Sequence, residues 1–278
     1  MTTVVITGAA GFLGRALTIH LVGNGLTVIP VSRRPLPGMS QVQDYSQSPV
    51  GDVLIHLAEE PDRNRVNSLG EAYIRYASSA VKVLSSRFNQ KIIYASSGAV
   101  YGDENKNPCK TDMPVVATDV YSKSKLVNER IVLDSGGTVV RLSNLFGDGM
   151  SANNVMSDIL RQIPGAGPLR VHDDKPVRDY LPVSDAISAF SLLLENNYCG
   201  LVNIGSGIGT SVRALAEIFL SLVGQGYREV IATEPSSRPS INILDISETM
   251  RILDWTPTSP LKDQLARLIY NKAKSAHE

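Results

Sequence analysis

The chain of 278 residues is long enough for one large domain or two smaller ones, and it can bury a core without disulfides or a structural metal. Hydrophobic residues make up 43% and charged residues 19% of the chain, which excludes a disordered or fibrous protein. Lys plus Arg number 27 and Asp plus Glu number 27, so no net charge attracts nucleic acid or an anionic membrane. We therefore expect neither as a partner, and local groups must hold any anionic ligand.

Targeting and metal signals are absent from the sequence. No apolar run approaches the ~20 residues that span a bilayer, and no basic region of a signal peptide precedes the first apolar run. The cysteines are too few for a disulfide framework, and we expect reduced thiols, with Cys109 in a loop and Cys199 buried. The histidines are scattered and predict no metal site: His20, His56, His172 and His277. These features predict a soluble, cytoplasmic protein.

Short apolar runs alternate with helical patterns up to residue 146. The runs that we expect to form strands are 4–7, 28–31, 53–57, 92–95 and 139–142. We expect helices after the first run and over 70–86 and 119–134. Because strands that read as continuous apolar runs are buried on both faces, this alternation predicts a parallel, doubly wound α/β sheet.

The pattern loosens after residue 146. The segment 150–178 is rich in loop residues, and a strand over 202–204 and helices over 212–223 and about 260–273 follow. We expect a cofactor-binding domain of residues 1–147 plus 178–205. The smaller, substrate-binding lobe is then formed by residues 148–177 plus 206–278.

A glycine-rich turn lies between the first predicted strand and the first helix. Glycines at positions 8, 11 and 14 allow a tight turn, close approach of a pyrophosphate, and packing of the helix on the strand. The first helical N–H groups then bind the anion. The expected cofactor contacts are Gly8, Gly11, Phe12, Leu13 and Gly14. The alternative is a purely structural turn.

The second predicted strand ends in Ser32-Arg33-Arg34. An acidic residue here would bind the ribose 2′-hydroxyl of NAD, whereas an arginine accommodates the 2′-phosphate of NADP. Paired arginines suit bidentate binding of a phosphate. We therefore favour NADP(H) over NAD(H), the alternative being a solvated basic turn.

Tyr121 and Lys125 lie four residues apart on a predicted helix and therefore share one face. A neighbouring ammonium favours the phenolate, which makes Tyr121 a candidate general acid or base. Ser97 follows the strand 92–95 at its carboxyl end, where open α/β sheets bind ligands. A surface helix and a turn cap are the structural alternatives.

These motifs occur together with several others, in a characteristic order. They are T-G-x-x-G-F-L-G at 7–14, H-L-A at 56–58, S-S-x-x-V-Y-G at 96–102, Y-x-x-x-K at 121–125, R-L-S-N-L-F-G at 141–147, R-D-Y-L-P-V-S-D at 178–185, N-I-G-S-G at 203–207 and L-D-W-T-P at 253–257. In this order the chain resembles the extended short-chain dehydrogenases/reductases of the NAD-dependent epimerase/dehydratase family, which act on nucleotide sugars. The resemblance implies a Rossmann-type fold.

The resemblance also implies a role for individual residues. Tyr121 would exchange a proton with the C4 oxygen of the sugar, Ser97 would hydrogen-bond that oxygen, and Lys125 would hold the nicotinamide ribose. The remaining cofactor contacts implied are Leu57, Ala58 and Asn67. The remaining substrate contacts implied are Asn144, Arg178 and Arg238. Ordinary salt bridges are the alternative for the two arginines.

Departures from the family pattern reduce the number of candidate reactions. Gly98 and Ala99 stand where the family's 4,6-dehydratases carry an Asp-Glu pair. Gly98 also stands where the branch that epimerises at C3 and C5 has a cysteine. Glu59 and Glu60 replace the usual small residues after H-L-A, without a derivable effect on substrate choice.

Simple redox chemistry at C4 remains. We favour NADPH-dependent reduction of a nucleotide-linked 4-keto-6-deoxyhexose, as in deoxysugar and surface-polysaccharide synthesis. The alternative is a 4-epimerase with tightly bound NAD. A non-catalytic nucleotide-binding regulatory module is disfavoured because Ser97, Tyr121 and Lys125 are all present. The resemblance further implies a homodimer formed through the helices 70–86 and 119–134.

Overall fold

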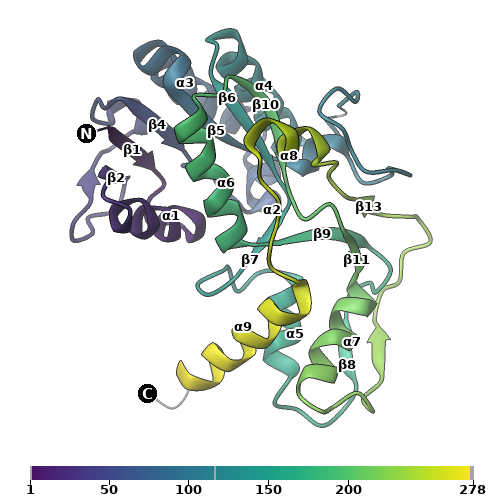
Figure 1. Ribbon diagram of the computed structural model, residues 1–278. Coiled ribbons are helices and arrows are strands. Elements are labelled where there is room, and N and C mark those ends of the chain that lie inside the picture. The colour runs from purple at the N-terminus through teal and green to yellow at the C-terminus, as the bar shows by residue number, and fades with distance from the viewer. Residues whose placement is uncertain (1, 116, 276–278) are drawn as a thin grey trace.

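A seven-stranded parallel sheet forms the centre of the larger part of the molecule (Figure 1). The computed structural model describes residues 2–115 and 117–275. The strands, in their order across the sheet, are β10 (Gly200–Ile204), β6 (Thr138–Leu142), β5 (Ile92–Ser97), β4 (Val53–His56), β1 (Thr3–Thr7), β2 (Thr27–Ser32) and β3 (Ser40–Gln41). Every neighbouring pair is parallel. The predicted doubly wound, Rossmann-type sheet is thereby confirmed.

Helices cover both faces of this sheet. α1 (Phe12–Gly23) and α6 (Val183–Asn196) pack on one face, and α3 (Glu71–Phe88) and α4 (Val120–Asp134) pack on the other. β1 illustrates the cause, because Val4 and Ile6 are buried toward α1 and α6 whereas Val5 is buried toward α3 and α4. A strand with two buried faces requires a continuous apolar run. The short helix α2 (Arg63–Leu69) precedes α3.

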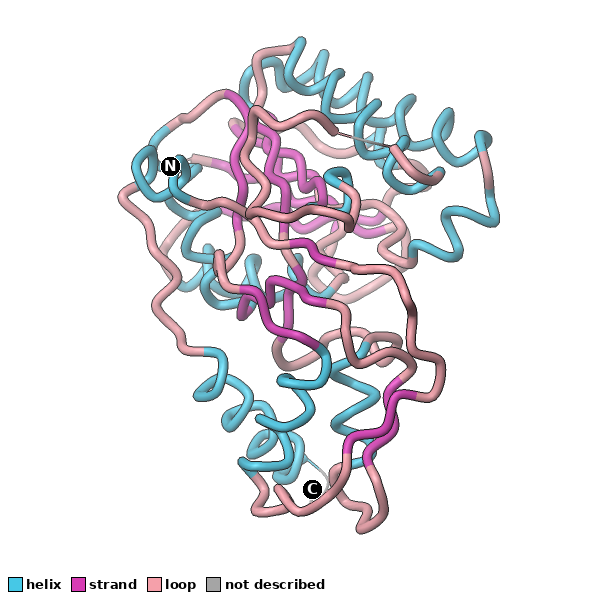
Figure 2. The backbone as a smooth tube through the Cα atoms, turned by 90° about the vertical axis from the view of Figure 1, so that its right-hand side faces the viewer, coloured by secondary structure: helices cyan, strands magenta, loops and turns pink. Residues whose placement is uncertain are grey.

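A smaller lobe lies beside the carboxyl ends of the strands, in the lower part of Figure 1. Its elements are β7 (Asn144–Phe146), α5 (Val155–Gln162), β8 (Leu169–Val171), β9 (Val177–Pro182), β11 (Gly209–Ser211), α7 (Val212–Leu222), β12 (Val230–Ala232), β13 (Ile241–Asn242) and α9 (Leu261–Ser275). β9 pairs with β7, β11 and β13, and β8 pairs with β12. Figure 2 shows these short strands separated from the large sheet. α5, α7 and α9 share a second apolar core.

The course of the chain between the two parts is more interleaved than the sequence indicates. β10 pairs with β6, so 200–204 returns to the large sheet, whereas β9 pairs outside it. Helix α8 (Ser247–Leu253) and Trp255 pack in the core of α1 and α6 although they fall in the predicted segment 206–278. The predicted domain division itself stays a prediction.

Cys109 lies in a loop, as expected, whereas the predicted burial of Cys199 was wrong. Cys109 is buried and Cys199 is exposed. The backbone of Cys109 donates to Ile243 and accepts from Asp245, which holds this loop against the chain between β13 and α8. Cys199 lies in the turn after α6, where Asn197 follows the helix in the left-handed conformation. Burial of the loop depends on a partner more than 130 residues away, which sequence spacing does not reveal.

Candidate active site

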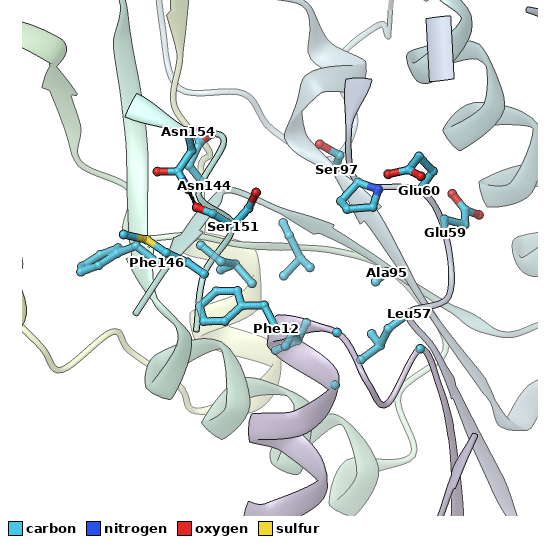
Figure 3. A pocket seen from close by; sticks show the side chains of 18 of the residues that line it. Phe12, Leu57, Glu59, Glu60, Ala95, Ser97, Asn144, Phe146, Ser151 and Asn154 are labelled. Atoms are coloured by element: carbon cyan, nitrogen blue, oxygen red, sulfur yellow. Dashed lines mark hydrogen bonds between the residues drawn. The ribbon is translucent and has the colours of Figure 1, made fainter. Parts of the chain in front are cut away.

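A cleft of about 880 Å³ opens at the carboxyl ends of β1, β2, β4 and β5. One wall comes from the turns that follow these strands, and the other comes from the smaller lobe. Figure 3 shows Phe12, Leu57 and Ser97 on the first side and Asn144 and Asn154 on the second. Open α/β sheets bind ligands at this edge.

The glycine-rich turn shapes the floor of the cleft. Gly8 has a φ of +72°, and a Cβ there would lie 2.8 Å from the backbone of Leu57. A Cβ on Gly14 would lie 2.3 Å from the carbonyl oxygen of Gly8, so α1 packs against the turn only because residue 14 is a glycine. Gly11 begins α1 without a side-chain cap, which leaves the first N–H groups of the helix available to an anion. These residues fit the pyrophosphate of a dinucleotide.

The end of β2 places Ser32, Arg33 and Arg34 on the wall of the cleft. Arg33 lies over the ring of Tyr45, 5.4 Å from its centroid, and donates a 3.0 Å hydrogen bond to the hydroxyl of Tyr76. Sequence analysis did not identify either tyrosine as a neighbour. The two aromatic side chains hold the guanidinium at the rim, and a positively charged, partly ordered rim fits a 2′-phosphate.

Tyr121, Lys125 and Ser97 meet in the cleft as the sequence predicts. Tyr121 and Lys125 lie in the first turns of α4, and the Lys125 Nζ is 5.9 Å from the centre of the Tyr121 ring. The Nζ also donates a 2.9 Å hydrogen bond to the carbonyl of Ala95, at the end of β5. Ser97 lines the cleft and also caps the turn that follows β5 by accepting from the N–H of Ala99.

Asn67 does not line the cleft, among the residues that the structure describes. Its Oδ1 accepts a 3.0 Å hydrogen bond from the N–H of Tyr121, and its Nδ2 donates to Asp119, the N-cap of α4. Asn67 therefore fixes the start of the helix that carries Tyr121. Its predicted contact with the cofactor stays a prediction.

A buried carboxylate beside Lys125 is the main feature that sequence analysis missed. Glu59 forms a 2.8 Å ion pair with the Nζ of Lys125, and both side chains are less than 10% exposed. Glu59 also accepts hydrogen bonds from Tyr94 and Asn128, each of 2.7 Å. The sequence signal was Glu59 itself, a charged residue where the family has a small one.

Burial and this ion pair set the protonation of the surrounding groups. Burial opposes the charged form of Lys125, but the attraction of Glu59 outweighs it and raises the pKa of the ammonium. Burial also opposes ionisation of Glu59, yet Lys125 lowers the pKa of that carboxyl. Burial lowers the pKa of His56 to about 4 and raises the pKa of Tyr73 to about 12. At neutral pH the ion pair is therefore surrounded by uncharged rings.

The structure places some of the predicted substrate residues in the cleft and leaves one outside it. Asn144 and Arg178 line the cleft, whereas Arg238 does not belong to its described lining. Arg178 is held by Ser240, through hydrogen bonds of 2.9 Å to its carbonyl and 2.7 Å to its hydroxyl. Arg238 instead pairs with Asp103 at 2.9 Å. The arrangement in this structure matches the salt-bridge alternative for Arg238, and its predicted contact with the substrate stays untested.

Two buried hydroxyls in the cleft wall were not identified from the sequence. Ser143 and Tyr180 line the cleft, and neither hydroxyl oxygen has a hydrogen-bond partner among the described residues. Burial raises the pKa of Tyr180 to about 12, so the phenol is protonated at neutral pH. Unpaired buried hydroxyls are costly unless a ligand supplies the partner, so both are candidate substrate contacts.

Residues 2–115 and 117–275 form neither a metal site nor a membrane span. No three His, Cys, Asp or Glu side chains of this part of the chain are arranged to hold a metal ion. No helix in the same range is long and apolar enough to cross a bilayer. His277 lies outside the described residues.

The sheet, the glycine-rich turn and the Tyr121–Lys125 pair define an extended short-chain dehydrogenase/reductase. The model of the NAD dependent epimerase/dehydratase family matches residues 4–205. The chain belongs to this family, which confirms the resemblance inferred from the motifs.

Relatives and solved structures represent several reactions on nucleotide sugars. The chain is 27% identical to dTDP-4-dehydro-6-deoxyglucose reductase of Escherichia coli, over 96% of each chain. It is 23% identical to UDP-glucuronic acid decarboxylase 1 of Arabidopsis thaliana, over 96% of this chain and 68% of that protein. UDP-glucose 4-epimerase of Thermotoga maritima, with UDP-glucose, superposes with a TM-score of 0.86 at 22% identity and covers 99% of each chain. Other similar folds were solved with NAD or with NADPH. These comparisons support a nucleotide-sugar enzyme that uses NAD(P), without selecting one reaction.

Proposed function

We propose that the protein is an NADPH-dependent reductase of a nucleotide-linked 4-keto-6-deoxyhexose. The observation that carries this proposal is the arginine pair at the end of β2, on the wall of the cleft and without an acidic residue between Gly14 and Asp44. The 2′-phosphate distinguishes NADPH from NADH, and NADPH is the cofactor of reductive synthesis. Beside Ser97, Gly98 and Ala99 offer no titratable group for elimination of water.

NADPH, when bound, supplies a hydride to C4 of the sugar. The phenol of Tyr121 donates its proton to the C4 oxygen, so the carbonyl becomes an alcohol, and Tyr121 regains a proton from water. The hydroxyl of Ser97 donates a hydrogen bond to the same oxygen and stabilises the charge that develops on it. Lys125 retains an N–H for the nicotinamide ribose, since Glu59 and Ala95 accept from only two of the three.

The nucleotide diphosphate is proposed to bind between Arg178 and Asn144. Two hydrogen bonds to Ser240 and one to the carbonyl of Val177 orient the Arg178 guanidinium, which reduces the ordering needed on binding. Arg238, the second arginine that the family resemblance implies for this role, would have to leave Asp103 to reach the substrate.

A turnover assay with NADPH and a panel of nucleotide-linked 4-keto-6-deoxysugars tests this function. We expect stoichiometric loss of NADPH and a new C4 alcohol, followed by absorbance and NMR. The epimerase alternative gives the opposite result: the purified protein retains NAD and interconverts ordinary nucleotide hexoses at C4 without net loss of cofactor. Failure of both reactions would favour the regulatory alternative.

We also propose a homodimer formed through α3 and α4. These helices pack side by side, and Val83 and Val127 are exposed on them. Sedimentation equilibrium is expected to give twice the chain mass for the wild type. The double variant Val83→Glu, Val127→Glu is expected to be monomeric, because dimerisation would remove its two like-charged carboxylates from water. The exposed Ile19→Glu change on α1 serves as the control and leaves the mass at two chains. A wild-type monomer at micromolar concentration contradicts this proposal.

A further inference from the structure

The carboxylate of Glu59 is buried in direct contact with the catalytic lysine. Its Oε2 lies 2.8 Å from the Nζ of Lys125, and its Oε1 accepts 2.7 Å hydrogen bonds from the hydroxyl of Tyr94 and the amide of Asn128. Figure 3 shows Glu59 next to Ala95, the residue whose carbonyl accepts the second hydrogen bond of the ammonium. Both oxygens of Glu59 are thus held by donors, as expected for an ionised carboxylate.

The charges around this pair cancel. The titratable groups around Lys125 and its partners are His56 on β4, Tyr73 on α3, Tyr94 on β5, Glu129 on α4 with Arg141 on β6, Asp119 before α4 with Arg63 on α2, and Glu60 after β4 with Arg65 on α2. Burial lowers the pKa of His56 to about 4 and raises the pKa of both Tyr73 and Tyr94, so these rings are neutral at pH 7. Glu129 pairs with Arg141, and Asp119 pairs with Arg63. Glu59 is therefore the charge that compensates Lys125.

We propose that Glu59 is a positioning residue that keeps Tyr121 protonated, by neutralising Lys125 and by holding its ammonium between two acceptors. The inference rests on the proposed function, because a reductase needs Tyr121 as a proton donor. An uncompensated ammonium near the phenol stabilises the phenolate. The phenolate suits an enzyme that begins by removing a proton from an alcohol, and it cannot donate a proton to a carbonyl oxygen.

The test replaces Glu59 by glutamine and follows ionisation of Tyr121 in the free protein. The ultraviolet absorbance of tyrosinate is titrated in each protein, and the Tyr121→Phe titration on the same background is subtracted. Removing the negative charge leaves Lys125 to stabilise the phenolate, so the midpoint of the Tyr121 transition is expected to fall by about one pH unit. Glu60→Gln is the matched control, because Glu60 lines the same cleft but pairs with Arg65, and its midpoint is expected to equal that of the wild type.

A second variant guards against a folding defect in Glu59→Gln. Glu59→Asp keeps the charge and withdraws it by one methylene, so its midpoint is expected between those of the wild type and Glu59→Gln. Circular dichroism establishes that each titrated variant is folded. A residue with only a structural role would not order the midpoints by the charge at this position.

The pH dependence of turnover supplies the second readout. Because the proton donor is lost at lower pH in Glu59→Gln, the alkaline limb of kcat is expected to move down by about the same one pH unit, with Glu60→Gln unchanged. Equal midpoints in the wild type, Glu59→Asp and Glu59→Gln would overturn the inference. A shifted midpoint in a protein that reduces none of the 4-keto sugars would instead overturn the proposed function and leave the coupling between Glu59 and Tyr121 intact.

Discussion

Replacing Tyr121 by phenylalanine is expected to lower kcat by about 10²–10⁴-fold, the range supplied by one positioned proton donor. The ring stays in place because the backbone N–H of residue 121 is held by Asn67 and the helix begins at the Asp119 cap. The dissociation constant of NADPH is therefore expected to change little. The two are measured by the rate of NADPH consumption and by fluorescence titration.

The control for this variant is Tyr270→Phe, a tyrosine that is largely exposed on α9, away from the cleft. It should turn over substrate at the wild-type rate. If Tyr121→Phe also kept the wild-type kcat, another group would have to protonate the C4 oxygen. If cellular function were preserved while turnover was lost, the non-catalytic, nucleotide-sensing alternative would gain support.

Removing the arginine pair at the end of β2 is expected to exchange the preferred cofactor. The double variant Arg33→Ala, Arg34→Ala loses the charge-assisted hydrogen bonds to a 2′-phosphate, each worth about 1.5–3 kcal/mol, or roughly 10–150-fold in the dissociation constant of NADPH. NADH has no 2′-phosphate, so its dissociation constant should change by a much smaller factor. Competitive binding of the two cofactors measures both constants.

Arg130→Ala is the matched control, since Arg130 is an exposed arginine of α4 paired with Asp134. Its removal changes the net charge of the protein without touching the cleft, and both dissociation constants should stay at the wild-type values. An equal loss for NADPH and NADH in the arginine-pair variant would show that these residues order the rim as a whole, and it would favour the NAD-dependent epimerase.

Arg33 and Arg34 are held differently at this rim, and replacing each of them alone by alanine tests their contributions separately. Arg33 is held by Tyr45 and Tyr76, whereas Arg34 donates its backbone N–H to the hydroxyl of Ser32. The pre-ordered guanidinium of Arg33 loses less side-chain entropy on binding. We therefore expect Arg33→Ala to raise the dissociation constant of NADPH more than Arg34→Ala does.

Local patterns in the sequence predict the framework of the fold and much of the cleft. The apolar run around Val5 forms β1 because both faces of that strand are covered, and the glycines at 8 and 14 form the turn because a side chain there would collide with the backbone. Tyr121 and Lys125 share a face because a helix places residues four apart together. Each of these features has a short local pattern of residue types, so spacing suffices to predict it, even though the backbone that a side chain on Gly8 would meet belongs to Leu57.

Contacts between distant segments are not encoded in spacing. Glu59 meets Lys125 only because the carboxyl end of β4 lies beside the first turns of α4. Arg238 pairs with Asp103 from a loop 135 residues away. The burial of Cys109 depends in the same way on the chain after β13. The free energy of a buried charge depends on which groups surround it in space, and that is a property of the assembled sheet and lobe. For this protein the residue types specify the chemistry that is available, and the folded arrangement specifies that the charge beside Lys125 is that of Glu59.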